Sequence, residues 1–195
     1  MVNIRRLVPP HTPHCGEMWN RTGCPQMRKF ILPALAGLLI STPAMAETTQ
    51  RDLEVIGRAL GFVEGASGSD RTVAIVYDAG SEAEAQALAS AMAGGLSAGR
   101  VTLNARLVPM ADTGSISGAD AAVLLGGAAG DAGVFGAASS AGVMTVSTDM
   151  GCVESAQCVM GVQSAPSVRI VVNRGAADSS SVSFAAAFAM MIEEI

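Results

Sequence analysis

The chain has 195 residues, a formal net charge of −5 at pH 7, a hydrophobic content of 50% and an aromatic content of 4%. An acidic chain is poorly suited to nucleic acid, because the phosphate backbone requires a cationic protein surface. Anionic membrane surfaces are disfavoured for the same reason.

Residues 1–26 show no periodic apolar segment. This stretch holds two histidines and two cysteines, namely His11, His14, Cys15 and Cys24. A signal peptide normally begins at the N-terminus, so we interpret these residues as a wrongly assigned start upstream of Met27 or as a disordered leader. The alternative is a zinc knuckle, although an H-x-x-H preceding one Cys pair has the wrong order for a zinc finger.

Residues 27–46 have the three parts of a Sec-type signal peptide. A basic Arg-Lys pair precedes an apolar run over 30–40, and Ala-Met-Ala ends at Ala46, which predicts cleavage before Glu47. The apolar run is too short for a bilayer core, which needs about 20 residues. A membrane anchor or a buried core helix is the alternative, and no cysteine follows the cut as in a lipoprotein. The sequence therefore predicts a periplasmic protein that is not membrane-embedded after cleavage.

Residues 47–195 have the length of one domain. They contain seven arginines, no lysine, no histidine and sixteen acidic residues, so their formal charge is about −9. The acidity of this part strengthens the case against nucleic acid as a partner.

The first half of this domain alternates helical and strand patterns. Apolar residues at three- and four-residue spacing predict a helix over 51–64, and a β-branched run predicts a buried strand over 72–77. Ser81 with Glu84 three residues later predicts a capping box at the start of the next helix. The buried edge of that helix is expected to contain Leu88, Met92 and Leu96. Alternating residues predict a further strand over 101–108.

The second half continues with short apolar runs. Strands are expected over 121–125, 143–147, 159–162 and 168–172. The last two are expected to form an antiparallel hairpin around Pro166, while residues 126–141 suit a loop and a short helix. The final helix is expected over 181–194. This order predicts one three-layer α/β domain, with a mainly parallel sheet of about five to six strands and a C-terminal hairpin plus helix.

The side chains absent from residues 47–195 limit the possible chemistry. Without His or Lys there is no Ser-His-Asp triad, no histidine metal site, no Schiff-base lysine and no P-loop lysine. Paired carboxylates could hydrolyse glycosides, but the clefts of such enzymes are usually walled by aromatic residues, which are scarce here. The sequence predicts a protein that is not an enzyme, with no catalytic residue, no cofactor and no metal.

Four polar residues follow predicted parallel strands. Open α/β sheets bind ligands at the carboxyl ends of their strands, so a ligand crevice is expected at Asp78, Ser81, Ser147 and Asp149. The glycine cluster over 126–133 also follows a strand, where phosphates often bind. Its spacing matches neither the dinucleotide fingerprint nor a Walker loop, so a tight turn with close packing is the preferred interpretation.

Cys152 and Cys158 are an even pair with five residues between them. In an oxidising compartment such a pair predicts a disulfide, either structural or regulatory. A zinc or redox-catalytic pair would instead favour C-x-x-C spacing.

The stretch over 143–177 resembles the YfiR-like family of periplasmic proteins. The matching parts are a "vLTvSd"-type strand, two cysteines, a short strand and a "v.i.vN..aA" segment, here 143–147 with Asp149, Cys152, Cys158, 168–172, Asn173 and Ala176-Ala177. The resemblance implies a non-enzymatic periplasmic regulator that binds a membrane protein partner such as a diguanylate cyclase. The alternative function is small-molecule binding by a single lobe, similar to a periplasmic substrate-binding protein of an ABC transporter.

Overall fold

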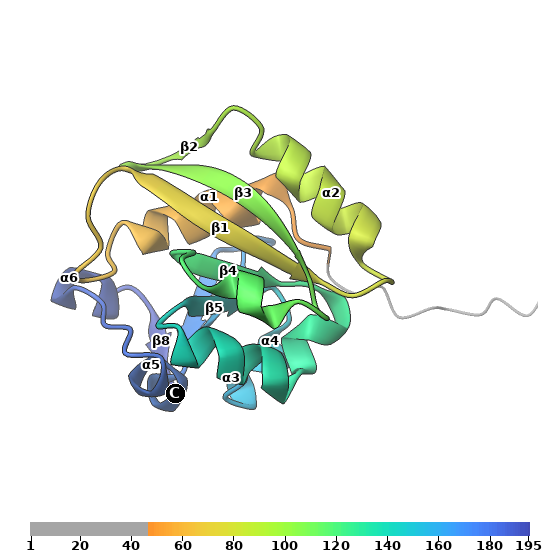
Figure 1. Cartoon of the computed structure of the whole chain (residues 1–195). Helices are drawn as coiled ribbons and strands as arrows, with labels where there is room; N and C mark the ends of the chain where they lie inside the picture. The colour runs from red at the N-terminus through yellow and green to blue at the C-terminus, as the bar shows by residue number, and fades with distance from the viewer. Residues whose placement is uncertain (1–46) are drawn as a thin grey trace, which may run out of the picture. The chain divides into compact units, whose positions relative to one another are not determined.

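A computed structural model describes residues 47–195, through which an eight-stranded sheet runs (Figure 1). The predicted leader over 1–26 and the signal peptide over 27–46, including Ala46, lie outside the described residues. The strands are β1 (Asp70–Tyr77), β2 (Leu96–Ala98), β3 (Val101–Pro109), β4 (Ala121–Leu124), β5 (Met144–Ser147), β6 (Met160–Gln163), β7 (Arg169–Val172) and β8 (Glu193–Glu194). The helices are α1 (Gln50–Leu60), α2 (Glu82–Ala91), α3 (Ala132–Ser140), α4 (Met150–Glu154), α5 (Arg174–Ser179) and α6 (Ala186–Ala189), with 3-10 turns η1 (Thr113–Ile116) and η2 (Gly126–Gly130).

The strand order is β2-β3-β1-β4-β5-β6-β7-β8. Strands β3, β1, β4, β5 and β6 are all parallel, whereas β2 joins β3 and β7 joins β6 in antiparallel fashion. The predicted mainly parallel sheet and the C-terminal hairpin are therefore confirmed. The sheet is wider than expected, because β2 and β8 extend its two edges. From β1 the chain crosses first to β3 on one side and later to β4 on the other, which makes a topological switch point at β1.

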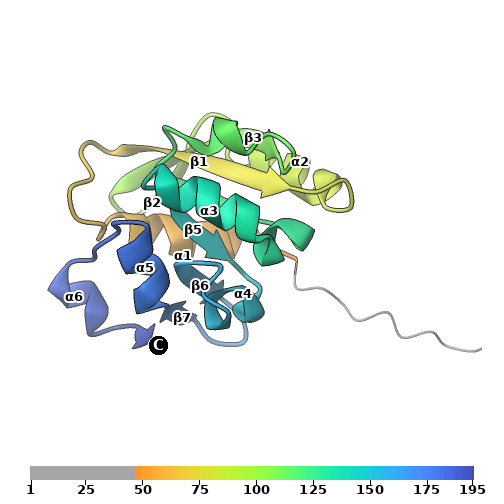
Figure 2. The same cartoon turned by 60° about the horizontal axis from the view of Figure 1, so that its bottom comes forward.

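Both faces of the sheet are covered, as the apolar run over 72–77 predicted. Val73 and Ile75 of β1 lie in a core shared with α1 and α2, whereas Ala74 and Val76 lie in a second core with α3 and α4. All four are fully buried. Figure 2 shows α3 in front of the strands and α1 behind them. This alternation gives the three-layer arrangement, because successive strand residues point to opposite faces.

The capping box predicted at Ser81 is wrong. Ser81 has φ −106° and ψ 9°, outside the extended region that an N-cap residue adopts, and its side chain makes no capping bond. A capping box instead begins α1, where the Thr49 N–H donates to Asp52 Oδ2 at 2.8 Å and the Asp52 N–H donates to Thr49 Oγ1 at 3.3 Å.

The final helix expected over 181–194 is also wrong. Asn173 caps the earlier helix α5 by accepting a bond from the Ala176 N–H at 3.0 Å. The chain then forms only the four-residue α6 before Glu193–Glu194 pair with β7 as β8. Salt bridges from Arg169 to Glu193 and from Arg174 to Glu194 fasten that edge.

Helix α2 ends earlier than its apolar spacing suggested. Gly94 and Gly95 have φ values of +82° and +91°, which L side chains rarely adopt, so they turn the chain away from the helix. Leu96 therefore lies in β2 and not on the helix, whereas Leu88 and Met92 are buried as expected. Among residues 47–195, no helix has the length and apolarity needed to cross a bilayer.

Candidate ligand-binding crevice

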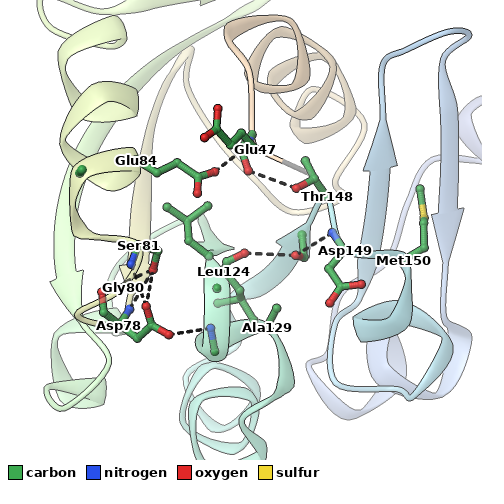
Figure 3. Close-up of a pocket in the computed structure, with 16 residues that line it drawn as sticks. Glu47, Asp78, Gly80, Ser81, Glu84, Leu124, Ala129, Thr148, Asp149 and Met150 are labelled. Atoms are coloured by element: carbon green, nitrogen blue, oxygen red, sulfur yellow. Dashed lines mark hydrogen bonds between the residues drawn. The ribbon is translucent and has the colours of Figure 1, made fainter. Parts of the chain in front are cut away.

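A crevice of about 1080 Å³ opens at the carboxyl ends of β1, β4 and β5 (Figure 3). Its lining includes all four residues expected there from the sequence, Asp78, Ser81, Ser147 and Asp149. The structure thus brings the four together at the edge that adjoins the switch point at β1. Ligand binding in this crevice remains a prediction.

Asp78 joins the end of β1 to the loop after β4. Its Oδ1 accepts bonds from the N–H and the Oγ of Ser81, each at 2.8 Å, and its Oδ2 accepts from the Gly127 N–H at 2.8 Å. The side-chain bond from Ser81 is the largest cause that lowers the pKa of Asp78 below its ordinary value, followed by the bond from Gly127. Asp78 is therefore ionised at neutral pH.

The glycine cluster permits this approach of Asp78. Gly126 has φ +53°, and a Cβ on Gly127 would lie 2.7 Å from Asp78 Oδ2. These two positions need glycine, in agreement with the expected tight turn. Because the Gly127 amide already donates to a carboxylate, it is not open to a phosphate, which argues against the phosphate-loop alternative.

Ser147 and Asp149 shape the opposite wall. The buried Ser147 Oγ donates to the carbonyl of Leu124 at 3.1 Å and accepts from the Asp149 N–H at 3.1 Å. Asp149 Oδ1 then accepts from the Gly151 N–H at 2.9 Å and caps α4. Ser147 therefore holds strands together, whereas Asp149 keeps its second oxygen free of any bond from residues 47–195 and available to the crevice.

The segment Glu47-Thr48 crosses between the two walls, and sequence reasoning did not foresee this role. The Thr48 N–H donates to Glu84 Oε1 at 2.7 Å, and Thr48 Oγ1 lies 3.2 Å from Thr148 Oγ1. Glu47 and Glu84 both line the crevice. The sequence assigned Glu47 to the cleavage site and Glu84 to a capping box, so neither was considered for the crevice.

The charged side chains of the lining all have the same sign. They are Glu47, Asp78, Glu84 and Asp149, and no arginine is present among the lining residues. A cleft lined by charges of one sign concentrates the electrostatic field, so these four carboxylates favour a cation in the crevice. Cleavage before Glu47 adds one α-ammonium group at the crevice and leaves the carboxylates in excess. Within residues 47–195, no group of three or more His, Cys, Asp or Glu side chains is arranged to hold a metal ion.

The predicted disulfide between Cys152 and Cys158 is present, with a Cα–Cα distance of 5.3 Å. Both cysteines are buried, at 2% and 0% exposure. Part of the segment between them is helical, because α4 extends from Met150 to Glu154. The bridge links α4, whose N-cap is Asp149, to the chain just before β6.

No family model and no curated protein matches this chain. Among solved structures it is similar to a conserved domain protein from Vibrio cholerae, with a TM-score of 0.50 and 16% identity over 76% of this chain and 61% of that one. It also matches the ABC domain in complex with L-Trp from Streptococcus pneumoniae, with a TM-score of 0.46 and 13% identity over 64% and 54% of the two chains. This chain thus spans about three fifths and about half of their lengths. At such identity the first likeness concerns the fold, and it supports the α/β class.

Proposed function

We propose that residues 47–195 form a periplasmic binding domain that holds a small cationic molecule reversibly in the crevice. The observation that carries this proposal is a crevice at the switch point of a parallel sheet whose charged lining residues are all acidic. Ligands of open α/β sheets bind in the crevice outside the carboxyl ends of the strands.

The lining suits an amine with an apolar body. Glu84 and Asp149 come from opposite walls, α2 and the loop after β5, so a ligand between them can meet a carboxylate on each side. Ala83 and Met150, which are exposed and half-buried, add apolar surface to the lining. A charge-assisted bond from an ammonium to a carboxylate is about twice as strong as a neutral hydrogen bond.

The same groups support binding without chemical conversion. A general base works best when its pKa lies near the operating pH, whereas the bonds from Ser81 and Gly127 lower the pKa of Asp78. Ser81 donates its hydroxyl to that carboxylate, and residues 47–195 contain no histidine or lysine to activate it.

Thermal unfolding with a panel of small amines and carboxylates tests this function. A ligand at 100 times its Kd stabilises the folded state by about 2.7 kcal/mol. This raises the Tm of a domain of this size by about 5–10 °C. We expect such shifts with amines and none with carboxylates of equal length.

Two variants on α2 locate the effect. Ala83 lines the crevice and is exposed, so Ala83→Trp should fill it and abolish the shift. Ala87 is exposed on the same helix but is not part of the lining, so Ala87→Trp should retain the shift. A panel in which no amine stabilises the protein, or an equal response from both variants, would contradict the proposal.

A second candidate function is docking on a membrane protein partner such as a diguanylate cyclase. Besides the sequence resemblance over 143–177, exposed apolar side chains at the C-terminal end favour it. Met190 and Met191 are 89% and 63% exposed, and Ile195 is exposed as well. Flexible methionine side chains are common on surfaces that bind protein partners.

Crosslinking in intact cells distinguishes the two candidates. A photoreactive residue at position 190 should capture a membrane protein if docking is the function, while the same residue at position 87 on α2 serves as the control. If neither position captures a membrane protein and amines stabilise the domain, docking is contradicted and ligand binding is the remaining function.

A further inference from the structure

A second pocket lies at the end of the sheet opposite to the crevice, where the central parallel strands begin. It measures about 500 Å³ and is lined by Arg58, Gly61, Phe62, Gly99, Arg100, Ala185 and Ala187. Gly99 and Arg100 immediately precede β3, which runs parallel to β1, so this pocket adjoins the amino ends of the central strands. Figure 1 shows α6 at the end of the molecule from which β1 starts, near the last turn of α1.

The pocket is cationic in an otherwise acidic domain. Arg58 and Arg100 are its two charged lining residues, and no acidic residue belongs to the lining. With seven arginines among residues 47–195 and no lysine, two in one pocket is a marked concentration of positive charge. Negative side chains therefore line the crevice at the carboxyl ends of the central strands, and positive side chains line the pocket at their amino ends.

These two arginines are available to a ligand. Arg58 lies 4.0 Å from Glu54 on the helix surface, a contact between exposed side chains that contributes little. Arg100 forms no hydrogen bond or ion pair with any residue over 47–195. By contrast, four other arginines are bound, to Asp120, to the carbonyls of Ile116 and Ser117, to Glu193 and to Glu194.

The neutral lining adds a close approach to the stem of Arg58 and an aromatic surface. Gly99 has φ +70°, and a Cβ there would lie 3.3 Å from Arg58 Cγ, so the turn packs closely against the stem of that side chain. Phe62 stacks on the buried Phe188 with ring centroids 5.2 Å apart and an interplanar angle of 18°. Stacking on a buried ring restrains Phe62 as an apolar wall.

We infer that this pocket binds a small organic anion with a flat apolar body. Its carboxylate or phosphate group lies between the guanidinium groups of Arg58 and Arg100, which bind such oxyanions through paired N–H donors. Its body packs against Phe62 and the two alanines. The inference is independent of ligand binding in the crevice, because the two sites share no lining residue.

Fluorescence titration with 8-anilinonaphthalene-1-sulfonate at low salt tests the inference. We expect saturable binding that weakens about two- to fivefold in Arg58→Gln and in Arg100→Gln, and more in the double variant, as exposed charge pairs typically contribute. Arg51→Gln is the matched control, because Arg51 is an exposed arginine of the same helix outside the pocket. The uncharged analogue N-phenyl-1-naphthylamine should bind much more weakly and show no dependence on these arginines.

Competition identifies the anionic group. Displacement of the dye by benzoate assigns a carboxylate ligand and displacement by phenyl phosphate assigns a phosphate ligand, with benzyl alcohol as the neutral control. Equal dye affinity in the wild type, the double variant and Arg51→Gln would overturn the inference. So would a failure of both anions to displace the dye.

Discussion

Breaking the bridge between Cys152 and Cys158 should lower the free energy of unfolding by about 2.4 kcal/mol. The bridge closes a loop of seven residues, with a sequence separation of 6. For a loop of this length, the chain-entropy model gives about 2.4 kcal/mol at 25 °C from restriction of the unfolded chain. For a domain of about 150 residues, this corresponds to a Tm lower by about 5–10 °C.

Urea unfolding measures this difference in two independent ways. Reduction of the wild type breaks the crosslink and leaves both side chains in place, whereas Cys152→Ala with Cys158→Ala removes it permanently. Alanine is chosen because both positions are buried, and serine would add the cost of an unsatisfied hydroxyl. Alkylation before reduction gives the number of free thiols.

The reasoning fails if the oxidised and reduced proteins differ by less than about 0.5 kcal/mol, well below the chain-entropy value. It fails equally if the unreduced protein already reacts with two equivalents of alkylating reagent. A double alanine variant that is much less stable than the reduced wild type would assign the loss to packing, because both thiols remain in the reduced protein.

Three further predictions concern the crevice and the start of the mature chain. Ser81→Ala should raise the pKa of Asp78 toward its ordinary value of 3.8, so the stability that this carboxylate contributes above that pH should be smaller, and its loss on acidification should be complete at a higher pH, as carboxyl NMR titration and acid unfolding would show. Gly127→Ala should destabilise the fold by about 1–3 kcal/mol because its Cβ would meet the Asp78 carboxylate, whereas Gly136→Ala in open space on α3 should be neutral or stabilising in urea melts. Mass spectrometry of the secreted protein should find Glu47 at its N-terminus, and a chain that retains residues 30–40 would contradict this.

The centre of the sheet could be predicted from the sequence because local patterns determine it. The apolar run over 72–77 has no polar face, so the strand must be covered on both sides. Once the strands are parallel, their carboxyl ends share an edge, and this places Asp78 and Asp149 at one crevice. The disulfide was predicted from the spacing of the two cysteines and from the predicted oxidising compartment.

The remaining features depend on contacts between distant residues. Thr48 reaches Glu84 across 36 positions of sequence, so no local pattern could show that the start of the domain forms part of the crevice. The apolar spacing of Phe184 and Phe188 fits a long helix equally well. The observed structure, a short α5 followed later by strand β8, depends instead on the cap at Asn173 and on the pairing of Glu193–Glu194 with β7.

Edge strands were missed for a related reason. Strand β2 has three residues and β8 has two, too few for a recognisable alternation. Each exists because a neighbouring strand offers unpaired backbone groups at the edge of the sheet.

The most direct test of a cation-binding crevice is an NMR titration of the ¹⁵N-labelled chain beginning at Glu47 with putrescine. Succinate, an anion with the same four-carbon length, is the matched control. We predict saturable shifts of the Gly80, Gly127 and Thr148 amides with putrescine and none with succinate. The affinity for putrescine should fall several-fold in Asp149→Asn, a variant that keeps an N-cap side chain for α4. Shifts of equal size with succinate, or no saturable shift at these three amides, would contradict the account.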